Sequence, residues 1–378
     1  MAAIPWLGFG ALVWWRLRHS RDVREYAPAR GANIPRVSVI VPARDEAHNI
    51  ERCVESLLQT TYANVEFIVV DDHSTDGTAS IAHRLIDGDA RARITSAPPL
   101  PAGWFGKQWA CAHGASLATG DVLLFTDADT WHAPDSLARA VTALETRNAD
   151  LLTLIGQQEM HTFWEKVGQP AVFLGIFAVM GGTERMNASR DPRKKAANGQ
   201  YLLMRRDVYD ALGGHEAVRG YVAEDVMFAQ TWTAAGRSAQ SVLALDHLST
   251  RMYRSLGEFI RGWRKNVWAG GKYLIHDHAV ARAIARVVFP VTPLIGVIPH
   301  VAIALSVLGL ASRWWLVFGL FGAAYQAGAL ALLYARIRFP VSAALLYPLG
   351  CLLQAYVFAV AAIRGDHTEW KGREYRIA

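Results

Sequence analysis

A chain of 378 residues, 52% of them hydrophobic and 19% charged, has room for one large α/β domain and a second, more apolar part. A net charge of +6 would suit nucleic acid, but the basic residues cluster beside apolar segments, which favours an anionic membrane surface. The three cysteines (Cys53, Cys111 and Cys351) have no paired spacing, which argues against a disulfide framework and against a zinc site.

The chain begins with a short apolar run, Ile4 to Trp15, which is followed by several arginines. Because this run has no small-residue cleavage site, residues 1–17 are predicted to be a retained membrane anchor rather than a signal peptide. The basic residues beside the anchor then predict that the globular part, residues 18–280, is cytoplasmic.

Residues 18–280 alternate between short buried strands and helical segments. Strands are predicted at residues 36–42, 65–70, 122–126 and 198–204, and helices at 49–58, 79–85, 110–118 and 134–145. This alternation, with short loops, predicts a parallel, right-handed, doubly wound α/β sheet. Ligands bind such sheets beyond the carboxyl ends of the strands, where Pro42, Asp71–Asp72 and Asp127–Asp129 fall.

Asp127-Ala128-Asp129 directly follows the strand at 122–126. Two carboxylates one residue apart at a strand end can hold a hard divalent cation, which can in turn hold a diphosphate. The alternative is a solvated turn in which Asp129 caps the next helix. The pair alone does not decide between the two interpretations.

Two more polar features precede helices in the same half of the chain. Asp71 and Asp72 end the second strand, where a carboxylate can accept hydrogen bonds from a base or a ribose; a polar loop is the alternative. Lys107 follows Gly103-Trp-Phe-Gly106 and is either a point charge for phosphate oxygens or an ordinary surface lysine.

Glu224-Asp225 opens another predicted helix. The helix dipole favours acids in a first turn, which is one explanation; the other is a general base for an incoming hydroxyl. Arg251-Met-Tyr-Arg254 and Gly262-Trp-Arg-Lys-Asn266 cluster basic and aromatic residues just before the apolar segments. They contact either lipid headgroups or a diphosphate and an acceptor.

Residues 281–363 are predicted to form membrane helices, because the chain is nearly all apolar from about Val287 to Ile363. Breaks near Arg313 and at Arg336-Ile-Arg338 leave stretches of roughly 20 to 24 residues, long enough to cross a bilayer. Three crossings would put the basic tail, residues 364–378, outside, which the positive-inside tendency disfavours. We therefore expect a cytoplasmic tail, with the proline-containing first stretch re-entering or lying at the interface instead of crossing.

Together these motifs resemble the inverting glycosyltransferases of family 2, which have the GT-A nucleotide-sugar fold with a mixed sheet. The resemblance runs from about Val37 to Asn266 and rests on the order of four stretches: Val39-Ile-Val-Pro-Ala-Arg-Asp-Glu46, Asp71-Asp-x-Ser-x-Asp-Gly77, Asp127-x-Asp129 and Glu224-Asp225. Trp104-x-Gly-Lys107 and Trp370-Lys-Gly-Arg-x-Tyr375 are similar to a membrane-bound branch associated with carotenoid and hopanoid glycosylation.

The resemblance implies a multi-pass membrane enzyme that moves one sugar from a nucleotide-sugar, expected to be a UDP-sugar, to a lipid hydroxyl. The donor site would comprise Pro42, Arg44, Glu46, Asp71, Asp72, Lys107, Asp127 and Ala128. A divalent metal, Mg²⁺ or Mn²⁺, would bind to Asp129 and Asp127, and Asp225 with Glu224 would supply the base. Contacts to the diphosphate or the acceptor would come from Arg251, Trp263, Lys265 and Asn266.

One departure from the family pattern bears on the product. Processive polysaccharide synthases of this family carry a Gln-x-x-Arg-Trp motif after the base, and this chain has no such sequence. We therefore expect transfer of a single sugar. A processive synthase and a catalytically inactive membrane scaffold are the alternative functions.

Overall fold

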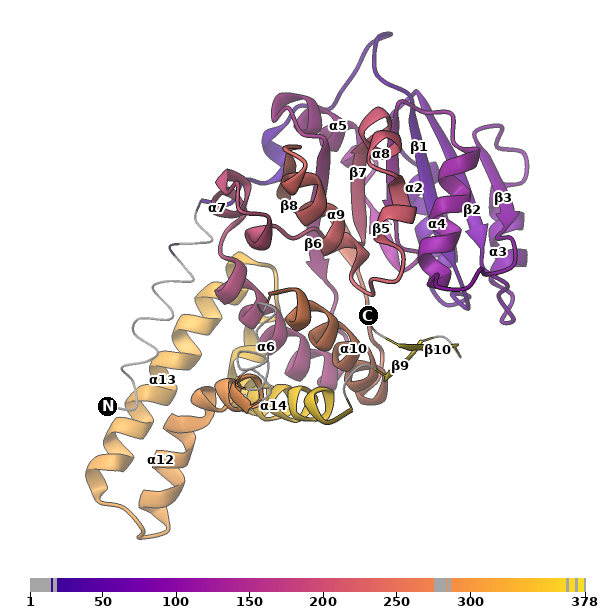
Figure 1. Ribbon diagram of the computed structural model, residues 1–378. Helices are drawn as coiled ribbons and strands as arrows, with labels where there is room; N and C mark the ends of the chain where they lie inside the picture. The colour runs from indigo at the N-terminus through magenta and orange to yellow at the C-terminus, as the bar shows by residue number, and fades with distance from the viewer. Residues whose placement is uncertain are drawn as a thin grey trace. The chain divides into compact units, whose positions relative to one another are not determined.

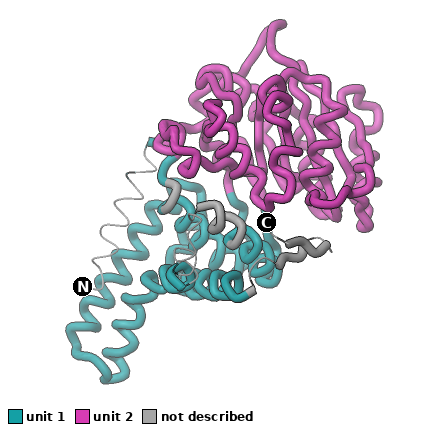
Figure 2. Tube along the Cα trace, viewed as in Figure 1, with its two compact units in different colours: residues 1–19, 158–182, 251–366 teal, residues 20–157, 183–250, 367–378 magenta. Residues whose placement is uncertain are grey.

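The computed structural model describes residues 15, 19–274, 284, 287–364, 367–370 and 373–376. The chain divides into two compact units, which Figure 2 distinguishes by colour. The sheet unit comprises residues 20–157, 183–250 and 367–378, and the helical unit comprises residues 1–19, 158–182 and 251–366. The anchor predicted at residues 1–17 lies outside the described residues except for Trp15, and the boundary predicted at residue 280 also lies outside them.

The sheet unit is built around a mixed sheet of eight strands (Figure 1). They are β1 (Val37–Ala43), β2 (Val65–Asp71), β3 (Ala92–Ser96), β4 (Val122–Thr126), β5 (Thr130–His132), β6 (Leu151–Gln158), β7 (Tyr201–Arg205) and β8 (Ala239–Thr250). Their order is β3-β2-β1-β4-β7-β6-β8-β5. The expected parallel arrangement holds for β1 to β4, whereas β7 is antiparallel to β4 and β6, and β5 is antiparallel to β8.

Helices cover both faces of this sheet. Side chains from α2 (Ile50–Leu58), α3 (Thr78–Ile86) and α5 (Ser136–Thr146) pack into one buried cluster, and those from α4 (Gly106–Leu117), α8 (Arg206–Ala211) and α9 (Glu224–Ala234) pack into a second. Successive residues of β4 alternate between the two clusters: Val122 and Leu124 belong to the first, and Leu123 and Phe125 belong to the second. This two-residue period explains why the strand is apolar throughout.

Short elements complete the sheet unit: η1 (Val23–Glu25), α7 (Thr183–Ala188), η2 (Pro192–Lys194) and η3 (Gly214–Val218). Two antiparallel strands, β9 (His367–Trp370) and β10 (Arg373–Arg376), follow near the C-terminus. The helical unit contains α6 (Phe163–Met180), α10 (Leu256–Leu274), η4 (Thr292–Val297), α12 (Ile298–Val307), α13 (Arg313–Arg336), η5 (Val341–Leu346) and α14 (Tyr347–Arg364).

Three segments of the helical unit are long and apolar enough to cross a membrane: Val287–Val307, Arg313–Arg336 and Val341–Ile363. The first contains the 3-10 helix η4 and the prolines Pro290, Pro293 and Pro299, because of which it was expected to re-enter or lie at the interface. α12 and α13 form an antiparallel pair, since Gly319 packs on Pro299 and the Gln326 amide donates to the Gly296 carbonyl at 2.9 Å.

Candidate active site

Hydrogen bonds lock together the loops that follow β1 and β2. The Asp45 N–H donates to Ser74 Oγ at 3.0 Å, and the Thr75 N–H donates to Asp45 Oδ1 at 2.8 Å. The Glu46 N–H donates to Thr78 Oγ1 at 2.7 Å. Asp45 has a φ of 50°, in the left-handed region that non-glycine residues rarely adopt, so these bonds hold an unfavourable turn in place.

Asp71 and Asp72 lie at the carboxyl end of β2, as predicted, and both are buried. Asp71 Oδ2 accepts a hydrogen bond from the Ser74 N–H at 3.2 Å, but its buried Oδ1 has no partner among the described residues. The Arg44 guanidinium donates to the Asp72 carbonyl at 2.6 Å and lies 3.8 Å from its carboxylate. A buried carboxylate oxygen without a partner is costly, so Asp71 Oδ1 is suited to accept from a ligand hydroxyl or N–H.

The segment after β4 turns directly into β5. Both the N–H and the Oγ1 of Thr130 donate to the Asp127 carbonyl, at 3.2 and 2.7 Å, and the buried Cys53 thiol donates to it at 3.6 Å. The following helix, α5, begins only at Ser136, so the interpretation of Asp129 as a helix cap is wrong. The methyl group of Ala128 packs into the core, and the carboxylates on either side of it lie in a fixed turn.

Asp129 is surrounded by other acids. Burial, followed by the charges of Asp127 and Glu46, raises the pKa of Asp129 to about 8, and a contact with Thr250 partly offsets this. Thr250 is nearby because it pairs with Thr130 in the register of β8 and β5. The buried Oδ1 of Asp129 has no hydrogen-bond partner among the described residues. A divalent cation would offset the repulsion between Asp129 and the neighbouring acids, and it would give Asp129 Oδ1 a partner.

Lys107 connects the carboxylates after β4 with those on α9. Its Nζ lies 2.7 Å from Asp127 Oδ1 and 3.2 Å from Glu224 Oε1. Burial acts to lower the pKa of Lys107, but Asp127 and Glu224 outweigh it and raise this pKa well above its usual value. The ammonium is therefore charged, and Lys107 is paired with two carboxylates, unlike an ordinary surface lysine.

Asp225 lies in the first turn of α9, where a helix start was predicted. Its Oδ2 accepts from the Gly199 N–H at 2.8 Å, and its Oδ1 accepts from the Val226 N–H at 2.8 Å. Burial and the neighbouring Glu224 raise the pKa of Asp225 to about 6, although Lys107 and the two N–H groups act to lower it. Asp225 is thus fixed in orientation and more basic than an ordinary aspartate.

Gly199 joins this site because β7 runs antiparallel to β4. Thr126, the last residue of β4, pairs with Tyr201, the first residue of β7. Residues just before β7 therefore lie beside those just after β4. The strand predicted to begin at 198 begins instead at Tyr201, whose N–H donates to the Asn198 carbonyl at 3.0 Å in a turn. An antiparallel partner for β4 was not predicted, so Gly199 was not expected to lie here.

A buried histidine supports the Asp127 turn. His132 Nε2 lies 2.9 Å from Thr130 Oγ1 and 3.1 Å from Thr126 Oγ1, and burial lowers the pKa of His132 to about 3. The ring is therefore neutral. The sequence did not indicate His132, because a lone histidine in a short strand carries no motif.

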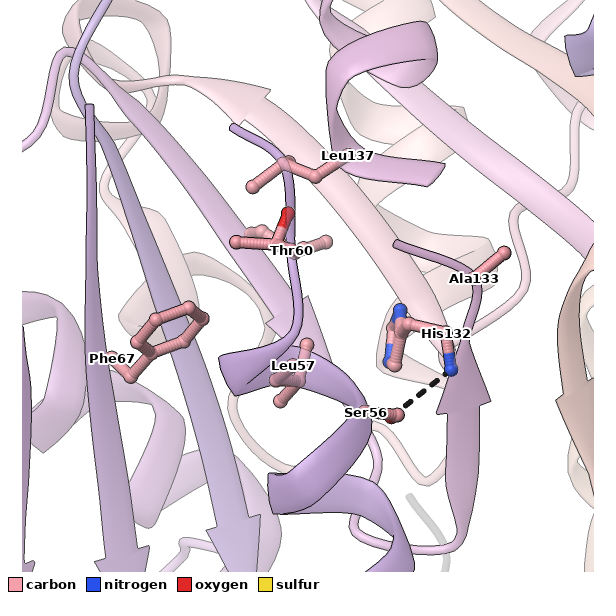
Figure 3. Close-up of a pocket in the computed structure, with 8 residues that line it drawn as sticks. Ser56, Leu57, Thr60, Phe67, His132, Ala133 and Leu137 are labelled. Atoms are coloured by element: carbon pink, nitrogen blue, oxygen red, sulfur yellow. Dashed lines mark hydrogen bonds between the residues drawn. The ribbon is translucent and has the colours of Figure 1, made fainter. Parts of the chain in front are cut away.

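A small pocket lies beside His132 (Figure 3). Most of its lining is apolar, including Leu57, Phe67 and Leu137, and the His132 N–H donates to Ser56 Oγ at 3.1 Å at its edge. None of the predicted site residues lines it, so it is a packing gap of the core rather than a donor site.

The residues predicted to contact the diphosphate or the acceptor belong to the helical unit. Arg251 pairs through two nitrogens with Glu165, at 2.8 and 3.3 Å. The Trp263 indole N–H donates to Gln169 Oε1 at 3.0 Å, and the Asn266 amide donates to the Tyr253 hydroxyl at 3.4 Å. Together with Lys265, they keep their proposed roles as predictions.

Comparison with known proteins finds a family match within the chain and similar whole proteins. Residues 38–213 match the family described as Glycosyl transferase family 2. A 4,4'-diaponeurosporenoate glycosyltransferase from Staphylococcus haemolyticus is 26% identical over 245 residues, which are 64% of this chain and 63% of that protein. The protein of the same name from Staphylococcus aureus (strain USA300) is 25% identical over 264 residues, 69% of this chain and 67% of that one. The first match therefore spans slightly less than two thirds of its relative.

A solved structure resembles both parts of the chain. The mannosyltransferase PcManGT from Pyrobaculum calidifontis, in complex with GDP-Man and Mn²⁺, is 22% identical, with a TM-score of 0.52 over 95% of this chain and 94% of that chain. At this identity the likeness shows the fold, a mixed GT-A-like sheet with long apolar helices toward the C-terminus. Residues 38–213 thus match Glycosyl transferase family 2, and the chain is homologous to the 4,4'-diaponeurosporenoate glycosyltransferases at about 25% identity.

Proposed function

We propose that this protein transfers one sugar from a nucleotide-sugar to a lipid acceptor, with inversion at the anomeric carbon. The observation that carries the proposal is the position of Lys107, whose ammonium contacts both Asp127 and Glu224. It joins a carboxylate pair suited to a metal-bound diphosphate with the helix turn that holds Asp225. A donor site and a base in one place are what a single displacement needs.

In this proposal Asp71 and Asp72 bind the nucleoside. The unpartnered Asp71 Oδ1 would accept from a ribose hydroxyl or a base N–H, and Arg44 holds the Asp72 backbone in position. Pro42 and Glu46 lie at the carboxyl end of the neighbouring strand β1. We expect UDP as the nucleotide; the fold relative was solved with GDP-Man, so guanine is the competing base.

Asp129 and Asp127 are the proposed ligands for Mg²⁺ or Mn²⁺. Their oxygens are the hard ligands that these ions prefer, and the buried Asp129 Oδ1 has no other partner among the described residues. No group of three or more His, Cys, Asp or Glu side chains in the described part of the chain could hold a metal alone. The remaining ligands would be diphosphate oxygens and water. When bound, the ion would stabilise negative charge on the departing diphosphate.

Asp225 is the proposed base. With a pKa of about 6 it is ionised at neutral pH, yet it holds a proton better than an ordinary aspartate. In the transfer, the acceptor oxygen bonds to the anomeric carbon, the bond from that carbon to the diphosphate oxygen breaks, and the acceptor proton passes to Asp225. The charge of Lys107 favours the departing diphosphate.

The acceptor is proposed to be a lipid hydroxyl. Three apolar segments long enough to cross a membrane, and the carotenoid-related names of the relatives, support a lipid. Those names also suggest a second acceptor chemistry, because 4,4'-diaponeurosporenoate is by its name a carboxylate. A carboxylate is already ionised at neutral pH and needs no base. Dependence on Asp225 therefore distinguishes a hydroxyl acceptor from a carboxylate acceptor.

The test uses the full chain in membranes with Mn²⁺ and a panel of UDP- and GDP-sugars, followed by mass spectrometry of extracted lipids. The expected result is a lipid that gains one hexose mass with a UDP-sugar. Long saccharide products would support the processive synthase instead. UDP binding that requires Mn²⁺, without transfer to any lipid and without donor hydrolysis, would support the inactive scaffold.

A further inference from the structure

Helix α6 leaves the sheet unit and returns to it within a short stretch of chain. The sheet unit includes residues up to 157 and resumes at Thr183, whereas α6 ends at Met180. Three peptide steps from Met180 to Thr183 span at most about 11 Å. A helix that crossed a bilayer would have its two ends on opposite sides, about 30 Å apart. Helix α6 therefore begins and ends on the side of the sheet unit.

Helix α14 packs against α6. Gly350 lies directly on the Val167 carbonyl, and a Cβ at Gly175 would lie 3.1 Å from the Gln354 amide. The buried residues of α14 recur along one side of the helix: Tyr347, Cys351, Gln354, Val357 and Ala361. One face of α14 thus covers a helix that does not cross the membrane.

The segment between α13 and α14 packs beside the residues that precede α6. Ile337 and Phe339, which follow α13, lie in the same buried cluster as Met160. Met160 is three residues beyond residue 157, where the sheet unit ends. The connection from α13 to α14 therefore lies on the same side as the start of α6.

The pair α12–α13 extends away from these contacts (Figure 1). At its base, Gly296 packs on Cys351 of α14. At its tip, Val307, Leu308, Leu310, Trp314 and Trp315 are all exposed. Helix α13 has 24 residues, and at 1.5 Å per residue it is about 36 Å long, enough for the hydrocarbon core.

We propose that the α12–α13 hairpin is the part of residues 287–364 that crosses the membrane, and that α14 lies in the plane of the interface. The exposed apolar residues of α14 and its approach form one stripe, spaced four, three, four and seven residues apart: Leu345, Leu349, Leu352, Tyr356 and Ile363. Lipid acyl chains are the occupant that fits this stripe, because it is wholly apolar and continues from an apolar hairpin.

This arrangement returns the basic tail to the side of the sheet unit. One crossing outward in Val287–Val307, the span that ends with α12, and one back in α13 leave Arg364 and the residues after it on the side from which the chain departed. The positive-inside tendency favours that placement for Arg364, Lys371, Arg373 and Arg376. The helix that does not cross is then α14, rather than the proline-containing stretch that the sequence had suggested.

Labelling of single cysteines tests the two crossings. The three native cysteines are buried, so the unsubstituted protein gives the background. Ser116→Cys marks the sheet unit, Ser312→Cys the hairpin tip and Ser342→Cys the connection to α14; all three positions are exposed. A membrane-impermeant maleimide is applied to intact cells and to inverted vesicles. We expect Ser312→Cys to react from one side, and Ser116→Cys, Ser342→Cys and a reporter after Ala378 from the other. A reporter on the Ser312 side would overturn the proposal, as would a Ser312→Cys that reacts from the Ser116 side.

Depth measurements test the orientation of α14 directly. Spin labels are placed at positions 349, 352, 356 and 363 of the full chain in vesicles of phosphatidylcholine and phosphatidylglycerol, with positions 317, 324 and 332 of α13 as matched controls. Residues 349 and 363 are separated by about 21 Å along a helix. An in-plane helix gives depths that agree within about one turn, 5.4 Å. A depth profile on α14 that matches the deep centre and shallow ends expected for α13 would overturn the proposal.

Discussion

The backbone N–H of Gly199 donates a 2.8 Å hydrogen bond to Asp225 Oδ2, the proposed base. A Cβ at position 199 would lie 3.2 Å from that oxygen and 3.2 Å from Lys107 Nζ. Gly199 therefore touches both the base and the ammonium that links α9 to Asp127. Because a side chain here would have to displace one of them, position 199 controls how the two charges are held.

Gly199→Ala is expected to lower kcat about 10- to 100-fold, because a displaced base is no longer aligned with the acceptor. The KM for the donor should change little, since Asp71 and Asp72 lie at a different strand end. Steady-state kinetics measure both. The matched control is Gly328→Ala in α13, where an added Cβ meets nothing within 4 Å. Equal losses in the two variants would contradict the role given to Gly199.

Asp225→Asn should lower kcat by about 100- to 10,000-fold for a hydroxyl acceptor, the usual range for loss of a general base. The amide keeps the shape of the carboxylate, so Mn²⁺-dependent UDP binding, measured by calorimetry, should stay within about threefold of wild type. Asp207→Asn, at an exposed position on α8, is the control. Near-normal turnover in Asp225→Asn would show that Asp225 is not a required base, and it would favour a carboxylate acceptor.

The pH dependence of kcat/KM should show an acidic limb near the pKa of Asp225, about 6. The base works when ionised, so the rate falls as pH decreases below this value, about tenfold per unit. Lys107 acts to lower the pKa of Asp225, so Lys107→Met should move the limb to higher pH, whereas Lys107→Arg should leave it nearly in place. If the limb moved to lower pH in Lys107→Met, the assignment of the limb to Asp225 would be incorrect.

Asp129→Asn should stabilise the folded protein while removing metal-dependent donor binding. Burial and the charges of Asp127 and Glu46 disfavour an ionised Asp129, and the amide removes this cost. A gain of about 1 kcal/mol would raise the Tm by roughly 2 to 4 °C. Thermal unfolding without metal, and UDP binding with and without Mn²⁺, are the two measurements. A lower Tm together with intact Mn²⁺-dependent binding would show that Asp129 is structural.

Much of the sheet and its edge could be predicted from sequence, because buried strands and helix starts are local patterns. The strand predicted at residues 122–126 begins and ends where β4 does. Strand ends and a helix start also lie where they were expected, at Asp71–Asp72, Asp127–Asp129 and Glu224–Asp225. These features need only the period of the strands and the position at which polar residues begin.

Contacts that depend on distant pairing could not be predicted. Gly199 and Thr250 reach the site through the antiparallel registers of β7 with β4 and of β8 with β5, and neither register has a local signal. The link from Lys107 to Asp127 and Glu224 joins three separate segments, and a lysine after a glycine gives no sign of its partners. Helix α6 was missed as a separate element because its apolar residues lie inside a charged region.

Thr250, which contacts Asp129, and Arg251, which pairs with Glu165, are consecutive residues. The candidate site is therefore joined by one peptide bond to the ion pair that holds Glu165. Glu165 is almost fully buried, and its pKa is lowered because the hydrogen bonds from Arg251 and from Thr162 outweigh the effect of burial. A chain cut after Thr250 would keep α6 but lose Arg251, leaving a buried carboxylate without its cation. A soluble form of the sheet unit therefore requires replacing residues 158–182 as well as removing the C-terminal helices.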